Sequence, residues 1–448
     1  MCYHIDKYTS HYLCFPCWFG QLRWSASALP LRKGSHMKYL PQDKLGSSHT
    51  GYQQQVKEAN IKSIFDLVRS GKCKSRAEIV RNMNLSATSV SVLVEELANR
   101  KLIDETGPAQ TTLPGRRPIS LRLNKNAHHL AVFSVKPEGV RFTLLSLECK
   151  ILEDRFFPLD CHTLNEATAG DVYTQLFDDI LRNQSKRFSP SKAVMIGVCF
   201  PGIYIEQDHL FHTETALGFP LTEESIRSFQ QRVGMSVFLF NSTRSMAYAE
   251  KKYLDAANPD TPDAPDIQNL IFVEISRGIR SSIISNGDIY PGPFNVSGEI
   301  GHFTLDYKGR PCSCGNRGCL ERYVNLDAIL DDAQQAARAA GIEPPESLET
   351  LAERYPDEPA LLESVKQSAQ LLAFGLYSVM CSSGMRRIVL GGGIEILGDG
   401  FLREVYQALC SRASLIRHVD LTYAQAGPDA DILGVAEHYL DKVFTITM

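Results

Sequence analysis

Apolar residues recur at helical spacing along residues 53–71. The recurring positions are Val56, Ile61, Ile64, Phe65 and Val68. Because side chains three and four positions apart share one face of an α-helix, this spacing predicts an amphipathic helix with one buried stripe. Gly71, a residue that favours helix ends, predicts where the helix stops.

Two further helices are predicted immediately downstream. Ser75 with Glu78 three positions later forms a capping-box pattern, so a short second helix is expected to begin there. Ser86 is the predicted N-cap of a longer third helix. The buried stripe of that helix comprises Val90, Leu93, Val94 and Leu97. A short helix, a tight turn and a longer helix are typical of a helix-turn-helix.

A polar loop with the sequence GRRP (Gly115–Pro118) and an alternating stretch at 119–124 follow, which predicts a winged helix-turn-helix. In such modules the first half of the third helix enters the major groove of DNA, and loop arginines contact phosphate or the minor groove. The predicted DNA contacts are Ser86, Thr88, Ser89, Ser91, Arg116 and Arg117. The alternative is a helical protein-interaction domain with a solvated basic face.

Charge is distributed unevenly along the chain. Residues 52–126 hold thirteen Lys and Arg against seven Asp and Glu, a net charge of +6. The whole chain carries −4, which leaves −10 for the other residues. A basic module on an acidic body favours an N-terminal contact with a polyanion such as DNA.

The pattern changes after Asn126. Helical stretches lie at 168–184 and 364–380. Six short apolar runs rich in β-forming residues lie at 129–135, 140–147, 193–200, 236–241, 270–276 and 386–393. Two hairpin-like strands followed by alternating helices and strands predict an α/β body with a mixed sheet.

No apolar run reaches the roughly 20 residues that a membrane-spanning helix needs, so no membrane contact is expected. Residues 1–50 are interpreted as an N-terminal extension that is disordered or, before Met37, artefactual, because GSHM at 35–38 resembles an expression scar. Most of the twelve cysteines are scattered singly, several of them in apolar stretches. That distribution is typical of reduced, buried thiols in a cytoplasmic protein.

Three cysteines depart from this distribution. Cys312, Cys314 and Cys319 lie within eight positions, in a stretch that also holds Gly315 and Gly318. In a reducing compartment this cluster is better interpreted as a metal site than as a disulfide, and the glycines would let the chain fold back on itself. Three thiolates leave one position of a tetrahedral site for a fourth ligand.

The stretch Gly298–Tyr323, GEIGHFTLDYKGRPCSCGNRGCLERY, resembles the signature of the ROK family of repressors and sugar kinases. The winged helix-turn-helix followed by GRRP is similar to the regulator branch of that family, and the resemblance runs from about Tyr52 to the C-terminus. It implies a two-lobed, actin-like (ribonuclease H-like) fold. It also implies His302 as the fourth metal ligand, and three thiolates with one imidazole favour a structural zinc ion.

The resemblance further implies a sugar site. Glu299, His302 and Glu321 match family residues that bind sugar hydroxyls, and carboxylates form charge-assisted hydrogen bonds with vicinal hydroxyls. Asn241 matches a family asparagine that contacts the sugar, and Gly218 matches a position in the sugar loop.

Three departures from the kinase pattern bear on catalysis. Ser242 stands where the family's kinases have an aspartate as general base, and a serine is not basic near neutral pH. Phe133–Val140 lacks an Asp-Gly-Gly turn, and Ser276–Ser282 places large side chains where a Gly-Thr-Gly turn should approach phosphate. Of the phosphate-loop glycines, the triplet Gly391–Gly393 is retained.

These patterns predict a sugar-responsive transcriptional regulator, a repressor of carbohydrate-utilisation genes, and not an enzyme. The expected organisation is an extension at 1–50, a winged module at 51–125 and a two-lobed sugar-sensing body at 126–448. Operator DNA, a sugar or sugar derivative, and further copies in a homodimer or homotetramer are the expected partners. The alternatives are a ROK-type, ATP-dependent sugar kinase with a degenerate site and a zinc-stabilised protein-interaction scaffold.

Overall fold

A computed structural model describes residues 49–108, 119–160, 164, 169–205, 210–213, 221–257, 267–293, 295–412 and 418–444. Nearly all of the N-terminal extension lies outside these residues, as do the GRRP loop with Arg116 and Arg117, and Gly218. Among the residues described, none of the helices combines the length and apolar composition needed to span a bilayer.

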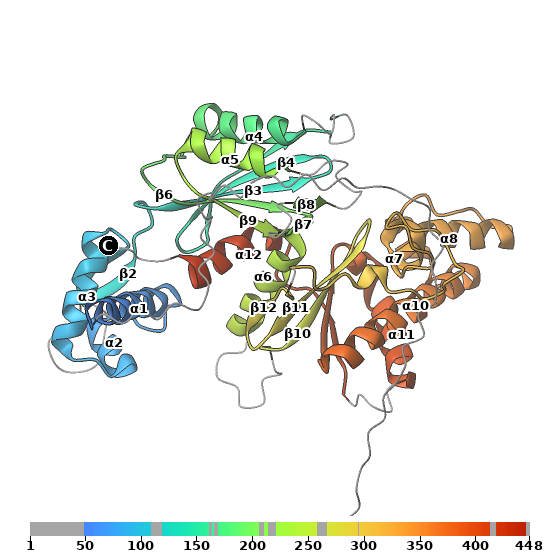
Figure 1. Ribbon diagram of the computed structural model, residues 1–448. Coiled ribbons are helices and arrows are strands. Elements are labelled where there is room, and N and C mark those ends of the chain that lie inside the picture. The colour runs from blue at the N-terminus through green and yellow to red at the C-terminus, as the bar shows by residue number, and fades with distance from the viewer. Residues whose placement is uncertain are drawn as a thin grey trace, which may run out of the picture. The chain divides into compact units, whose positions relative to one another are not determined.

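The first described elements are three helices and a two-stranded antiparallel sheet (Figure 1). They are α1 (His49–Arg69), α2 (Arg76–Met83), α3 (Ala87–Asn99), β1 (Ile103–Pro108) and β2 (Ile119–Leu123). This is the element order of the predicted winged helix-turn-helix. All four predicted stripe residues of α3 are buried, as are four of the five predicted in α1.

Local details of this module differ from the prediction. Ser75 and Ser86 cap α2 and α3 as expected, each accepting a backbone N–H bond. The Glu78 carboxylate, however, accepts from the backbone N–H of Lys74, so the predicted capping box at Ser75 is only half formed. Val56 is 42% exposed and does not belong to the buried stripe, because the helix turns it away from the core.

The first lobe of the body is built on a five-stranded sheet in the order β5-β4-β3-β6-β9. Its strands are β3 (His129–Lys136), β4 (Gly139–Ser146), β5 (Ile151–Pro158), β6 (Ala193–Phe200) and β9 (Val237–Asn241). Strand β3 pairs antiparallel with β4 and parallel with β6, which confirms the predicted mixed sheet.

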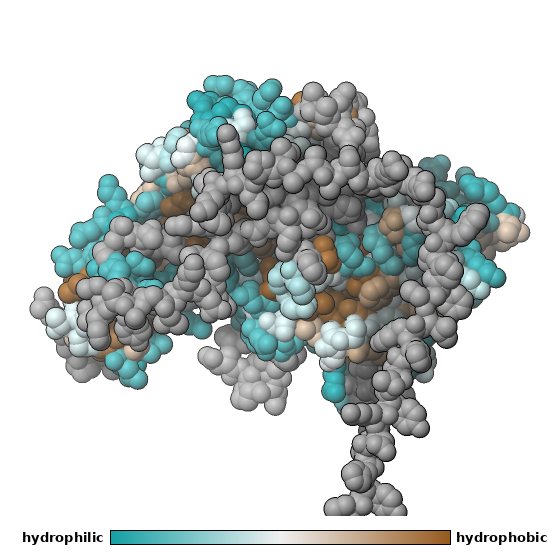
Figure 2. Space-filling model, viewed as in Figure 1, coloured by the Kyte–Doolittle hydropathy of each residue, from teal (hydrophilic) through white to brown (hydrophobic). Residues whose placement is uncertain are grey.

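Helices cover both faces of this sheet. They are α4 (Ala169–Asp179), α5 (Glu223–Val233) and α12 (Ala430–His438). Because successive side chains of a strand point to opposite faces, Ala131 and Phe133 pack with α4 and α5, whereas Leu130 and Val132 pack with α12. The outward surface of α4 and α5 is largely hydrophilic, at the top of Figure 2.

The second lobe repeats this topology. Its sheet has the order β12-β11-β10-β13-β14, with β11 and β12 antiparallel and β13 and β14 parallel. The strands are β10 (Leu270–Ile275), β11 (Ile279–Ser285), β12 (Asp288–Tyr290), β13 (Arg387–Gly391) and β14 (Asp420–Tyr423). Numbered along the chain, both sheets therefore read 3-2-1-4-5, and this duplication is the basis of the two-lobed, actin-like body.

One helix, α6 (Ser242–Ala257), directly follows β9 and packs against α12 and β11. The helices of the second lobe are α7 (Glu321–Val324), α8 (Leu326–Ala340), α9 (Leu348–Arg354), α10 (Pro359–Ser383) and α11 (Gly398–Arg412). The short elements are β7 (Gly202–Ile205), β8 (Leu210–Thr213), 3-10 turns at Ile300–His302 and Ile394–Leu397, and π turns at Ile180–Gln184 and Tyr439–Val443.

Candidate functional site

The three clustered cysteines lie on a backbone knuckle that is closed by its own hydrogen bonds. The Cys312 N–H donates to the carbonyl of Asn316, and the Gly318 N–H donates to the carbonyl of Arg310. An isolated bridge joins Thr304 to Cys319. The turn is thereby fixed in place between the 3-10 turn that carries His302 and helix α7.

Two glycines make this knuckle possible, as predicted. Gly315 and Gly318 have φ angles of +88° and +71°, in the left-handed region. A Cβ on Gly318 would lie 1.6 Å from the carbonyl oxygen of Asp306, whereas a Cβ on Gly315 would meet open space. The close packing at Gly318 brings Cys319 back towards the other two thiols.

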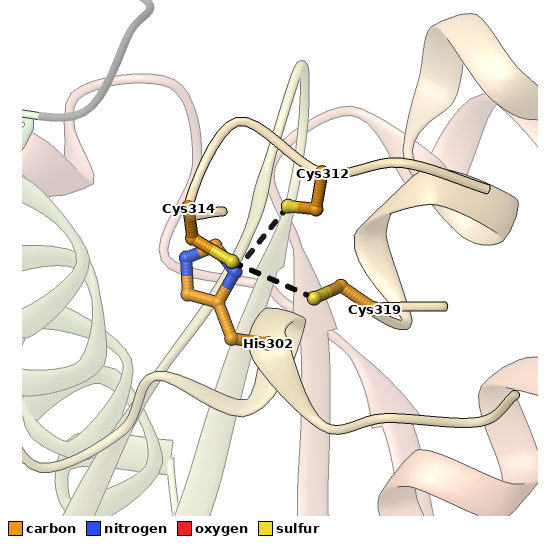
Figure 3. Close-up of side chains that lie close together, drawn as sticks. All are labelled: His302, Cys312, Cys314 and Cys319. Carbon is orange, nitrogen blue, oxygen red and sulfur yellow. Dashed lines mark hydrogen bonds between the residues drawn. The ribbon is translucent and has the colours of Figure 1, made fainter. Parts of the chain in front are cut away.

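His302, Cys312, Cys314 and Cys319 turn their side chains towards one point (Figure 3). Their four ligand atoms all lie within 4.8 Å of one another. The Cys314 and Cys319 sulfurs are 3.7 Å apart, and the Cys312 sulfur lies 3.7 Å from His302 Nδ1. A tetrahedral zinc ion with sulfur ligands at about 2.3 Å and nitrogen at about 2.0 Å requires ligand separations of about 3.5–3.8 Å.

The chemistry of this donor set also fits a metal ion. Burial, together with the hydrogen bond to Glu321, raises the pKa of the Cys312 thiol to about 12. A thiolate at this position therefore needs a nearby cation. The sulfurs are too far apart for a disulfide, whose S–S bond is about 2.05 Å. Four residues with compatible separations can close the coordination sphere of a metal ion.

The carboxylate of Glu321 lies beside this cluster. Its side chain is buried at the start of α7, and Oε1 accepts a bond from the Cys312 thiol at 3.0 Å and lies 3.8 Å from His302 Nδ1. Glu299 is half-buried and immediately precedes the 3-10 turn that carries His302. The structure therefore places Glu321 and His302 together and puts Glu299 at the other end of a single turn.

Asn241 and Ser242 lie at the junction of β9 and α6. The Asn241 side chain donates to the carbonyl of Gly202 at 2.7 Å and accepts from the backbone N–H of Arg244 at 3.0 Å. The amide thus caps the first turn of α6 and ties it to β7. The Ser242 hydroxyl is buried and has no hydrogen-bond partner among the described residues.

The three segments predicted to correspond to phosphate loops line one cavity of about 640 Å³. They come from the β3–β4 turn, the β10–β11 turn and the end of β13. Among the lining residues are Lys136, Ser242, Glu274, Arg277, Arg280, Gly392, Gly393 and Asp431. The sequence therefore identified segments that do converge in space.

Buried carboxylates stand inside this cavity. Glu274 contacts Arg280 at 3.5 Å and accepts a short bond from the Thr243 hydroxyl. A Cβ on Gly392 would lie 2.8 Å from Glu274 Cγ, so the glutamate lies directly against the glycine turn. Asp431, at the start of α12, accepts from the Ser134 hydroxyl at 2.6 Å and lies 3.4 Å from Lys136 Nζ.

The α3 face opposite the core carries Thr88, Val92 and Glu95. Thr88 and Glu95 are exposed, and Val92 is 55% exposed. Ser86 and Ser89, also predicted to contact DNA, are exposed at the start of the helix.

Two residues of α3 lie on its flanks. Ser91 is only half-buried, and its carbonyl accepts from Arg76 at 3.1 Å. Glu96 pairs with Lys57 at 2.8 Å and Arg100 at 2.6 Å. Val92 was not among the predicted DNA contacts, although the phase of the buried stripe already places it on the outer face of α3.

A sequence profile of the ROK family matches residues 139–442. The chain belongs to the ROK family. The predicted resemblance is thereby confirmed, and the matched residues run from β4 of the first lobe through the second lobe and include the Cys3His cluster.

Curated relatives of this ROK protein include named regulators. The xylose repressor of Bacillus subtilis (strain 168) is 27% identical over 396 residues, which cover 87% of this chain and 97% of that protein. The DNA-binding transcriptional dual regulator NagC of Escherichia coli (strain K12) is 27% identical over 286 residues, 63% of this chain and 66% of that protein.

Solved structures show the same fold. A ROK family transcriptional regulator, described as a homolog of the E. coli MLC protein, superposes with a TM-score of 0.71 at 20% identity and covers 86% of this chain and 97% of its own. The ROK hexokinase from Thermus thermophilus gives 0.54 at 20% identity, with 69% and 96% coverage. A regulator and a kinase thus share the body, so the site residues have to decide between the two activities.

Proposed function

We propose that this ROK protein is a sugar-responsive, DNA-binding transcriptional repressor that acts in the cytoplasm. The observation that carries the proposal is the joining of a basic winged helix-turn-helix to a ROK body whose phosphate-loop cavity holds buried carboxylates. The similarity to named repressors over 87% of the chain supports the same function.

Two features of the cavity argue against phosphoryl transfer. Ser242 supplies no general base, and loss of such a base typically costs about 10²- to 10⁴-fold in rate. In addition, two cations of the cavity are already paired with carboxylates, Arg280 with Glu274 at 3.5 Å and Lys136 with Asp431 at 3.4 Å, and so are less available to the phosphates of ATP. We therefore assign no catalytic residue to this chain.

The proposed sugar contacts are Glu299, His302, Glu321 and Asn241, with Gly218 as a further loop contact. The Nδ1 atom of His302 faces the thiols, and the same residue matches a sugar contact of the family. Zinc, held by His302 and the three cysteines, would fix the turn that carries these groups. A bound metal would also hold the Cys312 sulfur as a thiolate, with its proton released to solvent. The thiolate could no longer donate to Glu321, which would free this carboxylate for a sugar hydroxyl.

The proposed DNA contacts are Ser86, Thr88, Ser89, Ser91 and, from the structure, Val92, with Arg116 and Arg117 in the wing. The proposed assembly is a homodimer or homotetramer, because paired winged modules match the half-sites of an operator. Sugar binding would favour one lobe arrangement and thereby change the spacing of the two DNA-reading helices. The names of two relatives, a xylose repressor and an N-acetylglucosamine repressor, make D-xylose the first candidate effector and N-acetylglucosamine the second.

Two assays on the purified chain test this function. A thermal-shift screen should show a higher Tm with D-xylose or another sugar, because a ligand that binds the folded state stabilises it. A coupled ATPase assay with the same sugars should stay at background. Sugar-dependent ATP consumption would instead establish the kinase alternative, and binding of neither sugar nor DNA would favour the protein-interaction scaffold.

A further inference from the structure

One polar cluster joins the DNA-reading module to the C-terminal segment. Arg69, the last residue of α1, pairs with Glu437 at 2.6 Å and forms a short ion pair with Asp441. Glu437 lies in the last turn of α12 and Asp441 in the π turn (Tyr439–Val443) that follows it, and we call them the carboxylate pair. Partners separated by more than 360 positions in sequence are thus held in direct contact.

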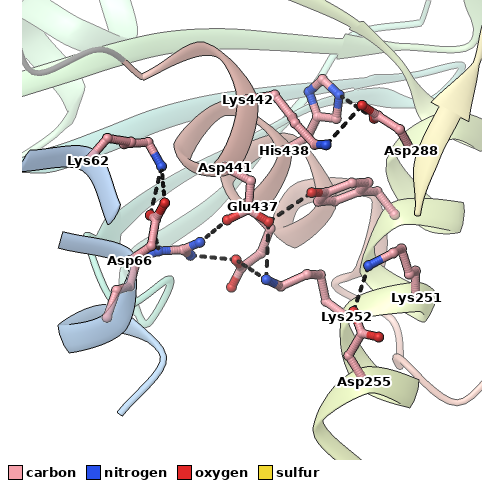
Figure 4. Close-up of polar contacts among 12 residues, drawn as sticks. Lys62, Asp66, Lys251, Lys252, Asp255, Asp288, Glu437, His438, Asp441 and Lys442 are labelled. Carbon is pink, nitrogen blue, oxygen red and sulfur yellow. Dashed lines mark hydrogen bonds and ion pairs between the residues drawn. The ribbon is translucent and has the colours of Figure 1, made fainter. Parts of the chain in front are cut away.

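The same carboxylate pair is also held from the body. Lys252 of α6 lies 3.1 Å from Asp441 and 3.7 Å from Glu437, and the Tyr248 hydroxyl donates to Asp441 at 2.8 Å. Figure 4 shows the two carboxylates between α1 and α6. The pair therefore binds one cation from the DNA-reading module and one from the sensor body.

This contact is shielded from solvent and flanked by packed side chains. The side chain of Arg69 is 10% exposed, and those of the carboxylate pair are 20% and 17% exposed. The Phe65 ring of α1 packs on Phe444 at a centroid distance of 5.5 Å. An ion pair at such a site is screened by salt much less than a surface pair and fixes a specific geometry.

Helix α6 connects this cluster to the candidate sugar site. Its first turn is capped by Asn241, and Arg244 donates to the backbone carbonyl of Asn295 at 2.8 Å. Asn295 lies four positions before Glu299, in the loop that leads to the 3-10 turn. Lys252 lies eight residues beyond Arg244 on the same helix, about 12 Å away at a rise of about 1.5 Å per residue.

We propose that Arg69 is a positioning residue that couples the sugar-bound state of the body to the DNA-reading module through the carboxylate pair. A shift of α6 on sugar binding changes how Lys252 and Tyr248 engage the pair. The pair's hold on Arg69, and with it the placement of α1, changes in turn. This inference rests on the proposed function and adds the residue that transmits the response.

The test uses the full chain and compares Arg69→Gln with a matched control, Arg100→Gln. Arg100 also forms an arginine–glutamate pair at 2.6 Å, with Glu96, but that pair lies wholly within the winged module. Operator affinity is measured with and without D-xylose on a duplex selected from a random library by the wild-type chain. Allosteric effects on binding typically span about 5- to 150-fold.

We expect the ratio of DNA dissociation constants measured with and without D-xylose to approach one in Arg69→Gln. In Arg100→Gln this ratio should stay at its wild-type value. Arg69→Lys, which keeps the charge but cannot bridge both carboxylates equally, should retain part of the response. A second readout needs no sugar: amide hydrogen exchange in residues 430–444 should accelerate in Arg69→Gln and not in Arg100→Gln.

The outcomes distinguish failure of the coupling role of Arg69 from failure of the proposed repressor function. A full D-xylose response in Arg69→Gln, or unchanged exchange in residues 430–444, overturns the coupling role and leaves the repressor function intact. Failure of the wild-type chain to bind selected DNA, or to respond to D-xylose, counts against the proposed function or effector, and the exchange measurement then decides the Arg69 contact alone. If Arg69→Gln does not fold, a D-xylose response of wild-type size in Arg69→Lys overturns the coupling role, and a reduced response supports it.

Discussion

His438 provides a quantitative test of the packing around the carboxylate pair. Its side chain is 15% exposed, and its ring lies 4.7 Å from the Phe240 ring and 5.0 Å from the Tyr248 ring, measured between centroids. Burial lowers the pKa of His438 to about 4, although Asp288 opposes the shift. The folded chain therefore holds this imidazole neutral at pH values where the unfolded chain protonates it.

The sign and the size of the change in folding stability with pH follow from this pKa. Above the unfolded-state pKa of about 6.5, the His438 imidazole is neutral in both the folded and the unfolded chain, so it does not change the free energy of unfolding. As the pH falls from about 6.5 towards 4, only the unfolded state gains the proton, so folding stability is lost. Linkage between pKa values of about 6.5 and 4 gives a loss of about 2 kcal/mol at pH 5.

The assay is urea unfolding at about pH 7.5 and about pH 5. His438→Phe, which preserves the aromatic packing and removes the titration, should lose about 2 kcal/mol less than the wild-type chain. His418→Gln, at an exposed histidine, should behave as wild type. Protonation of the zinc ligands acts equally on all three proteins and cancels in the difference. An equal loss in His438→Phe and wild type would refute the reasoning.

Three further changes test the sites. Gly318→Ala should lose zinc, measured by elemental analysis against one zinc per wild-type chain, while Gly315→Ala, with the same left-handed backbone but open space, should keep it. Ser242→Asp should leave sugar-dependent ATP turnover at background, because the carboxylates of the cavity remain, and measurable ADP formation would contradict this. Val92→Ala should weaken binding to selected DNA without changing the salt slope, since it removes an apolar base contact and no phosphate contact; a changed slope would argue against that role.

Much of the fold could be predicted because periodicity reports burial directly. The stripe of α3 and the six apolar runs that became strands are local patterns with one or two buried faces. Strand β5 escaped prediction because it lies at the sheet edge and is mostly exposed, so it carries no continuous apolar run. Strand β14 is short, with all four residues only partly buried.

Some features of the candidate sites could likewise be predicted from local sequence, and others could not. Cysteine spacing with two glycines predicted the three thiol ligands of the cluster, and the resemblance to the ROK family supplied His302; all four lie within eighteen consecutive residues. The contacts of Arg69 with the carboxylate pair and of Ser134 with Asp431 could not be predicted, because each joins residues about 300 or more positions apart. The residues that flank Arg69 and Asp431 in sequence give no indication of which distant side chain each will contact.

Binding of fluorescent DNA by the purified chain is a direct test of whether this protein is a sugar-responsive repressor. The duplex is one selected from a random library, its scrambled version is the control, and each is titrated at several salt concentrations with and without D-xylose. We expect the selected duplex to bind more tightly than the scrambled one. Its affinity should fall steeply with salt and change when the sugar binds. Equal affinity for selected and scrambled duplexes, unaltered by any sugar that raises the Tm of the chain, would contradict it.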